Sequence, residues 1–316
     1  MSELHVVYGT GPLGRAVVEE LVRRGKTVRV VSRSGMMPEA PQGVELVAGD
    51  LNDAGDVRRL TQGADVAYQC AQPHYWEWPE KFPPLQASII EGLADTGTKL
   101  VIAENCYMYG DPDGKPLTED LPYNAHTRKG RVRAAMSEAA LAAHRSGKVR
   151  AAIGRGSDFF GPWALGSSHG ERVFYPALMG KTASFGGKLD LPHTATYIGD
   201  FGKALVLLGE RDEALGQAWH VPSDRPQITQ RQFAELLYRE TGHPVKASGV
   251  SKPMMALAGL FIPGARESVE MLYEFEKPFV VDSSKFEQMF GVKATPIEEA
   301  IRVTVDWYRA HPQASH

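Results

Sequence analysis

The chain has 316 residues, a net charge of −3 at pH 7 and 43% hydrophobic residues, a composition that is ordinary for a globular protein. Because charges of both signs are scattered along the chain, no basic field indicates binding of nucleic acid or of an anionic membrane surface. No apolar stretch is as long as a membrane span and no signal-peptide pattern occurs, so we expect a cytoplasmic protein. With only two cysteines, Cys70 and Cys106, a disulfide framework is excluded.

The first predicted elements are a strand, a glycine-rich turn and a helix. An apolar run at 4–8 precedes the turn, and an amphipathic helical pattern follows at 13–24. This order is what the pyrophosphate of a dinucleotide requires, and the helix N-terminus offers free N–H groups to the anion. Gly9 permits the tight turn, Gly11 lets the backbone approach phosphate, and Gly14 lets helix and strand pack closely. A turn that binds nothing is the alternative. The predicted cofactor-binding residues are Gly9, Thr10, Gly11, Pro12, Leu13 and Gly14.

The end of the second predicted strand indicates which dinucleotide binds. This strand, at 27–31, runs into Ser32, Arg33 and Ser34. NAD-binding turns usually place an acidic residue here to bond the ribose 2′-hydroxyl, and that carboxylate would repel a 2′-phosphate. Ser32 stands at the acidic position, and the guanidinium of Arg33 can form two hydrogen bonds to a phosphate. A solvated surface arginine is the alternative. We therefore predict that these three residues favour NADP over NAD.

Strands and helices continue to alternate along the chain. Further strands are predicted at 44–47, 65–71, 99–103 and 150–154, and helices at 53–62, 83–96 and 129–146. This alternation predicts an α/β fold with a doubly wound parallel Rossmann sheet. We expect an NADP-binding domain at 1–166, with the sheet rejoined near 194–222. A smaller, mostly helical substrate-facing region at 167–316 is interleaved with it.

Residues that directly follow the strands are the next candidates, because ligands bind at the carboxyl ends of parallel strands. The predicted cofactor contacts after the third and fourth strands are Asp50, Leu51, Ala71 and Gln72. An aromatic loop comes next, which suits the wall or lid of a substrate pocket. Its predicted substrate-facing residues are His74, Tyr75 and Trp76. A packing cluster at the entry of a helix is the alternative for this loop.

The second half of the chain is predicted to be mostly helical. Helical patterns lie at 172–179, 230–241, 254–261 and 265–275, and a short strand at 279–282. The last helix, at 296–311, is predicted to be capped by Thr295. No cluster of basic residues suited to a diphosphate occurs in this half. Sugar-nucleotide chemistry is therefore disfavoured, and a smaller or more apolar ligand is favoured.

Four segments in order resemble the extended short-chain dehydrogenase/reductase superfamily, the NAD(P)-dependent epimerase/dehydratase-like proteins. Residues 48–51 resemble its Gly-Asp-Leu turn, and residues 105–111 resemble its serine-containing stretch that ends in Tyr-Gly. Residues 155–162 resemble its Arg-x-x-x-x-(Tyr/Phe)-Gly-Pro loop, and 196–204 a later segment. The resemblance implies that Asp50 contacts the adenine ring and that the loop with Phe160 closes over the nicotinamide side, where Phe160 faces substrate.

This chain departs from the family in its catalytic residues. Its enzymes use a serine and a Tyr-x-x-x-Lys motif for proton exchange, and no Tyr-x-x-x-Lys stands at the aligned position of this chain. Alignment puts Asn105 at the serine, Gly130 at the tyrosine and Ala134 at the lysine. Candidate catalytic residues are therefore Asn105, as a hydrogen-bond donor to a carbonyl, with Tyr109 and Lys129. The alternatives are that Tyr109 is only a packing residue and that Lys129 belongs to a solvated basic first turn of its helix.

Two functions fit this sequence. The first is an NADP-dependent oxidoreductase without the usual Ser/Tyr-x-x-x-Lys set, acting on a small, non-nucleotide carbonyl or enone. The alternative is a catalytically silent NADP-binding sensor or regulatory protein. No metal site is predicted, because no histidines and carboxylates stand at ligand spacing. The helices at 83–96 and 129–146 pair in dimers of the resembled family, so a homodimer is a further prediction.

Overall fold

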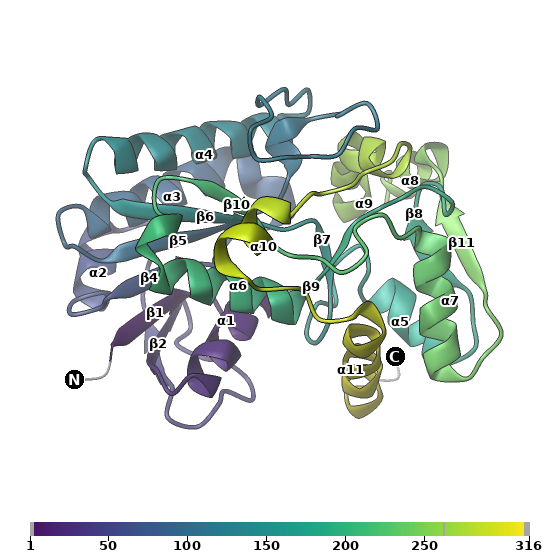
Figure 1. The fold of residues 1–316 in the computed structure, drawn as a ribbon, viewed down its shortest axis with the longest axis horizontal. Helices are drawn as coiled ribbons and strands as arrows, with labels where there is room; N and C mark the ends of the chain where they lie inside the picture. Colours follow the sequence, from purple (N-terminus) through teal and green to yellow (C-terminus); the bar gives the residue numbers. More distant parts are fainter. Residues whose placement is uncertain (1–2, 262, 313–316) are drawn as a thin grey trace. The chain divides into compact units, whose positions relative to one another are not determined.

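The computed structural model describes residues 3–261 and 263–312, and the chain forms two compact units (Figure 1). Unit 1 comprises Met1–Met108, Arg128–Arg155 and Phe201–Val221. Unit 2 comprises Tyr109–Thr127, Gly156–Asp200 and Pro222–His316. The assignment of cofactor binding to residues 1–166 and of substrate binding to residues 167–316 stays a prediction.

Unit 1 is built on a seven-stranded sheet in the order β10-β6-β5-β4-β1-β2-β3, in which every neighbouring pair is parallel. Its strands are β1 (Leu4–Tyr8), β2 (Thr27–Ser32), β3 (Glu45–Ala48), β4 (Val66–Gln69), β5 (Lys99–Glu104), β6 (Arg150–Arg155) and β10 (Ala218–His220). The predicted doubly wound parallel sheet is confirmed.

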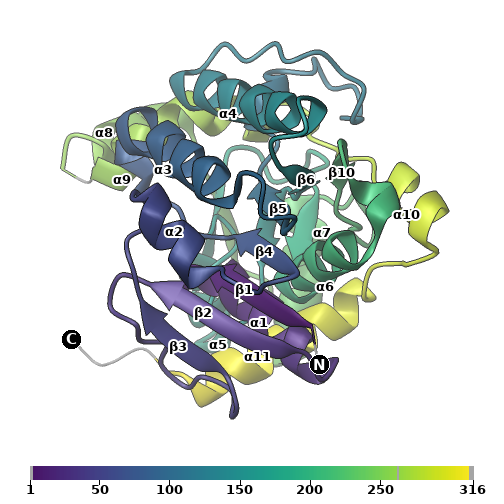
Figure 2. The same ribbon diagram turned by 90° about the vertical axis from the view of Figure 1, so that its left-hand side faces the viewer.

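Helices cover both faces of this sheet. Figure 2 shows α2, α3 and α4 on one face and α1 and α6 on the other. Their bounds are α1 (Pro12–Arg23), α2 (Ala54–Leu60), α3 (Trp78–Leu93), α4 (Arg128–Arg145) and α6 (Ile198–Glu210). Because both faces are covered, central strands are apolar along their length rather than alternating. Val6, Val7 and Tyr8 of β1 are all inaccessible to solvent.

Unit 2 is mostly helical, as expected, and its strands pair in two parallel two-stranded sheets, β11 with β8 and β7 with β9. Its core is aromatic: the ring of Phe174 stacks on that of Tyr308 at 4.9 Å, and Phe233 packs edge-on against Phe174. The elements are β7 (Asp158–Phe160), α5 (Glu171–Leu178), β8 (Ala183–Gly186), β9 (Ala195–Tyr197), α7 (Gln230–Thr241), β11 (Ala247–Val250), α8 (Lys252–Ala258), α9 (Pro263–Ser268), α10 (Ser284–Phe290) and α11 (Ile297–Ala310).

Three local predictions were wrong. Helix α3 begins at Trp78, five residues before the expected start, because Pro79 occupies a position in the first turn, where its missing N–H is not needed. Thr295 does not cap α11. Its backbone N–H and hydroxyl both donate to the carboxylate of Asp200, at 2.7 Å each, and Pro296 is the N-cap residue. The expected single helix at 265–275 is α9 followed by a 3-10 helix, Val269–Phe275.

The predicted strand at 279–282 forms only isolated bridges. Phe279 pairs with His193, and Val281 pairs with Leu117. Both contacts lie within unit 2. The segment is therefore extended and hydrogen-bonded without being a strand of either small sheet.

The turn between β1 and α1 depends on two glycines for close packing. Gly9 has φ of +102°, a region that side chains other than glycine rarely adopt. A Cβ at Gly14 would lie 2.2 Å from the carbonyl oxygen of Gly9. A Cβ at Gly11 would meet nothing within 4 Å. The turn therefore requires glycine at positions 9 and 14 for its own folding, but not at position 11.

The different space around Gly14 and Gly11 can be tested with an alanine substitution at each position. We expect Gly14→Ala to destabilise the protein by about 1–3 kcal/mol, because α1 must move away from β1 to admit a methyl group. Gly11→Ala is expected to cost less than about 1 kcal/mol, since only the intrinsic N-cap preference is lost. Urea unfolding of both variants and the wild type measures the difference. Equal losses of stability would contradict the packing role assigned to Gly14.

Candidate functional site

The glycine-rich turn presents an open backbone at the start of α1. The N–H of Gly9 donates to the carbonyl of Val31 at 2.9 Å, which fixes the turn against β2. Gly11 is exposed and is the N-cap residue, with Pro12 as the first residue of the helix. Thr10 and Leu13 are half-buried, and Gly14 is buried. The arrangement leaves a helix N-terminus with open space at Gly11, which is a site suited to an anion.

Ser32 ends β2, beside this turn. Its carbonyl accepts hydrogen bonds from the N–H groups of Gly35 (3.2 Å) and Gly49 (3.0 Å). Its hydroxyl is buried and has no hydrogen-bond partner within the described part of the chain. Arg33 and Ser34 are both exposed. An unpartnered hydroxyl and an exposed arginine are therefore consecutive in the sequence at the end of β2.

The residues after β3 and β4 differ in exposure. Asp50 is exposed, and its carboxylate accepts hydrogen bonds from the backbone and side chain of Asn52, both at 2.9 Å, which lower the pKa of Asp50. Leu51 is buried. The backbone of Ala71 lies directly under Gly9, since a Cβ on that glycine would come within 2.9 Å of it. Gln72 is exposed.

The aromatic segment after β4 divides into an exposed part and a buried part. His74 and Trp76 are exposed and their rings stack at 4.8 Å. Tyr75 is half-buried, and its hydroxyl donates to that of Tyr107 at 3.3 Å. Trp78 is buried in the first turn of α3. The helix-entry packing that we considered as an alternative therefore describes Trp78, while His74 and Trp76 remain open to a ligand.

Two cations of α4, Lys129 and Arg133, are buried against aromatic rings of this segment and of α3. The ammonium of Lys129 lies 4.5 Å from the ring centre of Tyr75, and the guanidinium of Arg133 lies 4.8 Å from that of Phe82. Lys129 is 0% and Arg133 is 1% exposed. The alternative of a solvated basic turn is therefore wrong for both of them.

A buried ionic network adjoins these cations, and sequence reasoning missed it. Glu104 ends β5 and Arg155 ends β6, and their side chains pair at 3.0 Å (Oε2 to Nε) across the two strands. Arg155 also donates to the hydroxyl of Ser137 at 2.6 Å. Arg133 lies 3.6 Å from the second carboxylate oxygen and donates to the carbonyl of Ala103. An acidic residue in an otherwise apolar strand was the available signal.

The remaining predicted residues have different surroundings. Asn105 is half-buried directly after β5, and its side-chain oxygen accepts from the N–H of Tyr107 at 3.3 Å, so its –NH2 group is oriented as a donor. Tyr109 is buried in unit 2, with its ring 6.0 Å from that of Tyr123. Phe160 is buried in the aromatic core of unit 2. The structure brings Lys129 and Tyr75 together in unit 1, and the catalytic and substrate-facing roles of the predicted residues stay predictions.

Unit 2 contains a buried acid–base cluster that sequence reasoning also missed. His193 Nε2 lies 2.8 Å from the carboxylate of Asp158, and His193 Nδ1 lies 3.2 Å from the carbonyl oxygen of Glu274. Burial alone would raise the pKa of Asp158, but the hydrogen bond and charge of His193 lower it. The pKa of Glu274 is raised well above its ordinary value. Burial is the larger cause, and the negative charge of Asp158 is the second. Burial also lowers the pKa of the adjacent His169 to about 3.

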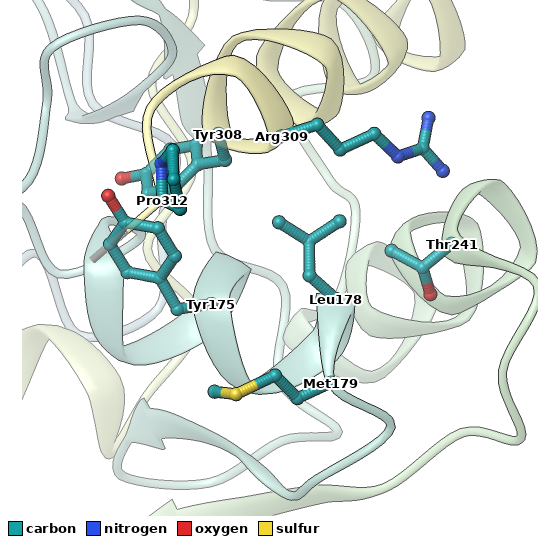
Figure 3. Close-up of a pocket in the computed structure, with 7 residues that line it drawn as sticks. All are labelled: Tyr175, Leu178, Met179, Thr241, Tyr308, Arg309 and Pro312. Carbon is teal, nitrogen blue, oxygen red and sulfur yellow. The ribbon is translucent and has the colours of Figure 1, made fainter. Parts of the chain in front are cut away.

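A separate cavity of about 390 Å³ lies in unit 2. Figure 3 shows its lining residues, which come from α5, α7 and the C-terminal helix: Tyr175, Leu178, Met179, Thr241, Tyr308, Arg309 and Pro312. None of the residues predicted from the sequence lines it. Its lining is largely apolar and carries no pair of groups able to exchange a proton with a ligand at neutral pH.

Other kinds of site find no support in residues 3–261 and 263–312. No group of three histidine, cysteine or acidic side chains could hold a metal ion there. Both cysteines are free thiols, and burial raises the pKa of Cys70 to about 12, which makes it a poor nucleophile. No helix in these ranges is long and apolar enough to cross a membrane.

The buried network in unit 1 generates a stability prediction. Glu104→Gln leaves two buried guanidinium groups without their carboxylate, and we expect a loss of about 3–5 kcal/mol in the free energy of unfolding. Glu91, an exposed carboxylate that pairs with Lys148, supplies the control. Glu91→Gln should leave stability nearly unchanged, because solvent screens that pair. Urea unfolding of both variants makes the comparison, and a Glu104→Gln protein as stable as the wild type would refute the role of the network.

Glu274 generates a pH dependence. Because its pKa is raised in the folded protein, the stability it contributes is complete below the pKa of the unfolded chain and is lost as pH rises through the folded value. Between those limits the loss is up to about 1.4 kcal/mol per pH unit. We expect Glu274→Gln to flatten the decline in unfolding free energy between pH 7 and 8, above the range in which the lowered pKa of His169 makes stability rise with pH. The same substitution at its exposed neighbour, Glu276→Gln, should leave the decline in place. A wild-type stability that does not fall over this range would contradict the assignment.

Comparison with known proteins agrees with this geometry. A curated relative, the dTDP-glucose 4,6-dehydratase of Mycobacterium tuberculosis (strain CDC 1551 / Oshkosh), is 23% identical over 325 residues, which cover 97% of this chain and 93% of that enzyme. The sterol-4-alpha-carboxylate 3-dehydrogenase, decarboxylating, of Mus musculus is 32% identical over 126 residues, which cover 37% of this chain and 34% of that enzyme.

Solved structures match over nearly the whole chain. The UDP-N-acetylglucosamine 4-epimerase of Bacillus cereus has a TM-score of 0.80 at 15% identity and covers 99% of both chains. The UDP-glucuronic acid 4-epimerase of Bacillus cereus, solved with UDP-glucuronic acid and NAD, has a TM-score of 0.78 at 15% identity, covering 98% of this chain and 100% of that one. The model of the NAD dependent epimerase/dehydratase family matches residues 6–221, about two thirds of the sequence, and the protein belongs to that family.

Proposed function

We propose that this protein is an oxidoreductase that binds NADP in preference to NAD and acts on a small, non-nucleotide carbonyl or enone. The observation that carries the proposal is the pairing of an open glycine turn with Ser32, Arg33 and Ser34 at the end of β2. The turn suits the pyrophosphate that all such dinucleotides share. The two hydroxyls and the guanidinium suit the 2′-phosphate that distinguishes NADP.

The residues present fit this cofactor. The open space at Gly11 admits a pyrophosphate to the start of α1. The buried, unpartnered hydroxyl of Ser32 can bond a ligand oxygen, which would satisfy its hydrogen-bonding capacity. Asp50 and Leu51 would border the adenine, and Ala71 and Gln72 would border the remainder of the dinucleotide at the carboxyl edge of β4. When bound, NADP supplies the acceptor or donor of a hydride.

Asn105 is the residue proposed to orient the substrate. Its amide oxygen is engaged by the backbone of Tyr107, so its –NH2 group can donate to a substrate carbonyl oxygen. An amide does this at any pH, because it does not titrate. Lys129 of unit 1 and, separately, Tyr109 of unit 2 are the proposed proton donors, and His74, Tyr75 and Trp76 are proposed to form an aromatic wall in unit 1. The exposed, stacked rings of His74 and Trp76 support that role.

A small substrate is proposed even though the Mycobacterium tuberculosis relative is named for dTDP-glucose. The second half of this chain carries no cluster of basic side chains suited to a diphosphate. That absence supports a substrate without a diphosphate.

A silent NADP-binding sensor is the second candidate function. The observation in its favour is that Lys129 and Tyr109 are both enclosed, at 0% and 3% exposure. The positions that align with the family's tyrosine and lysine hold Gly130 and Ala134 instead. Under this reading the dinucleotide binds as in the enzyme, but no substrate is turned over.

A cytoplasmic location and a homodimer are also proposed. Helix α4 carries a stripe of mostly small residues that would allow close approach of a second helix: Val132, Met136, Ala139, Ala140 and Ala143. Of these, Met136 and Ala140 are buried in the core of unit 1. Packing within one chain therefore accounts for part of the stripe. Ala139 is exposed on the same helix and would belong to a dimer contact.

The proposal predicts the outcome of a nucleotide titration. We expect NADPH to bind at least about tenfold more tightly than NADH, because the 2′-phosphate gains a charge-assisted contact with Arg33. Gly11→Ala should weaken both nucleotides at least about tenfold by blocking the approach of the pyrophosphate, with little change in stability. Fluorescence titration measures the affinities. Tighter binding of NADH than NADPH would reject the NADP preference.

Turnover then separates the two functions. Consumption of NADPH above the no-substrate blank with any member of a panel of small ketones, aldehydes and enones supports the oxidoreductase. Tight binding of NADPH with no consumption across the panel supports the sensor.

A further inference from the structure

The loop that follows β2, residues 33–40, is held in one conformation from two sides. On one side Gly35 packs on β3: its φ is +64°, and a Cβ there would lie 2.9 Å from the backbone nitrogen of Ala48. The N–H of Gly35 also donates to the carbonyl of Ser32. Met37, in the middle of the loop, is 4% exposed and anchors it to the unit 1 interior.

On the other side the loop is held by Arg15, the residue directly after the glycine turn. Arg15 is a first-turn residue of α1 and is 3% exposed. Its guanidinium donates from Nη2 to the carbonyl of Pro38, and its Nη1 lies 3.4 Å from the carbonyl of Glu39. One side chain from the pyrophosphate turn therefore reaches two consecutive carbonyls of the loop.

The conformation that Arg15 holds is one that the loop would not adopt by itself. Glu39 has φ of +51°, in the left-handed region, which costs a residue other than glycine free energy. Such a conformation persists only where the surroundings determine it, and Arg15 bonds the carbonyl of this residue and of the one before it. Without the guanidinium the far end of the loop loses these contacts, while its near end stays tied to β3.

We propose that Arg15 is a positioning residue of the dinucleotide site, which holds the 33–40 loop so that Arg33 and Ser34 face a 2′-phosphate. This inference rests on the proposed function and adds to it the residue that makes the preference for NADP. A phosphate bound by exposed side chains on a mobile loop must first order that loop, and the ordering cost reduces affinity. A loop already ordered by Arg15 avoids that cost. NAD has no 2′-phosphate, so its binding depends less on this loop.

The test compares Arg15→Met with the wild type in two measurements. Methionine keeps most of the buried stem and removes the donors. We expect NADPH to bind at least about tenfold more weakly and NADH to change by less than about threefold, so the preference falls. In the nucleotide-free protein we expect faster amide hydrogen exchange in residues 33–40. Arg15→Lys, which can hold one carbonyl at a time, should lie between the two.

Two further variants control the interpretation. Arg23→Met removes an exposed arginine of the same helix and should change neither measurement. Arg33→Met removes the proposed phosphate contact itself, and should lower NADPH affinity while hydrogen exchange in the loop stays at the wild-type rate. An unchanged NADPH-to-NADH ratio in Arg15→Met, or an equal loss of both affinities, would overturn the inference. A wild-type protein without a preference for NADPH would instead overturn the proposed function, and the exchange measurement would still report whether Arg15 orders the loop.

Discussion

The packing of β5, β6, α3 and α4 in unit 1 depends on the buried carboxylate of Glu104. A carboxylate removed from water costs several kcal/mol unless positive charge is supplied. Arg155 supplies it from the neighbouring strand, and Arg133 supplies it from α4. The face of Arg133 is in turn covered by the ring of Phe82 on α3. Two strands and two helices are therefore positioned by one charge that has to be neutralised.

The same helix, α4, carries the positions at which the resemblance leads one to expect the family's catalytic tyrosine and lysine. Those positions hold Gly130 and Ala134, and beside them α4 carries Lys129 and Arg133, both buried on aromatic rings. These cations are part of the packing between α4, α3 and the aromatic segment after β4. Lys129 and Arg133 therefore have structural partners of their own in this chain.

The proposed nucleotide half of the site does not include these cations. It is made of backbone: a helix N-terminus, two glycines that let α1 approach β1, and a loop clamped by Arg15. Backbone sites need few particular side chains, so they persist when the residues that perform chemistry are replaced. An oxidoreductase with an unusual substrate pocket and a sensor without turnover can both be built on this half.

The sequence by itself determined the order of strands and helices, the parallel sheet and the glycine turn. These depend on periodicity and on residues adjacent in the chain, which are local properties. Tertiary structure alone decided that Lys129 and Arg133 are buried, that Thr295 bonds Asp200 instead of capping α11, and that Glu104 meets Arg155 and Arg133. Each of these facts depends on which distant segments become neighbours. A charged side chain in a sequence carries no sign of whether water or a partner far along the chain will neutralise it.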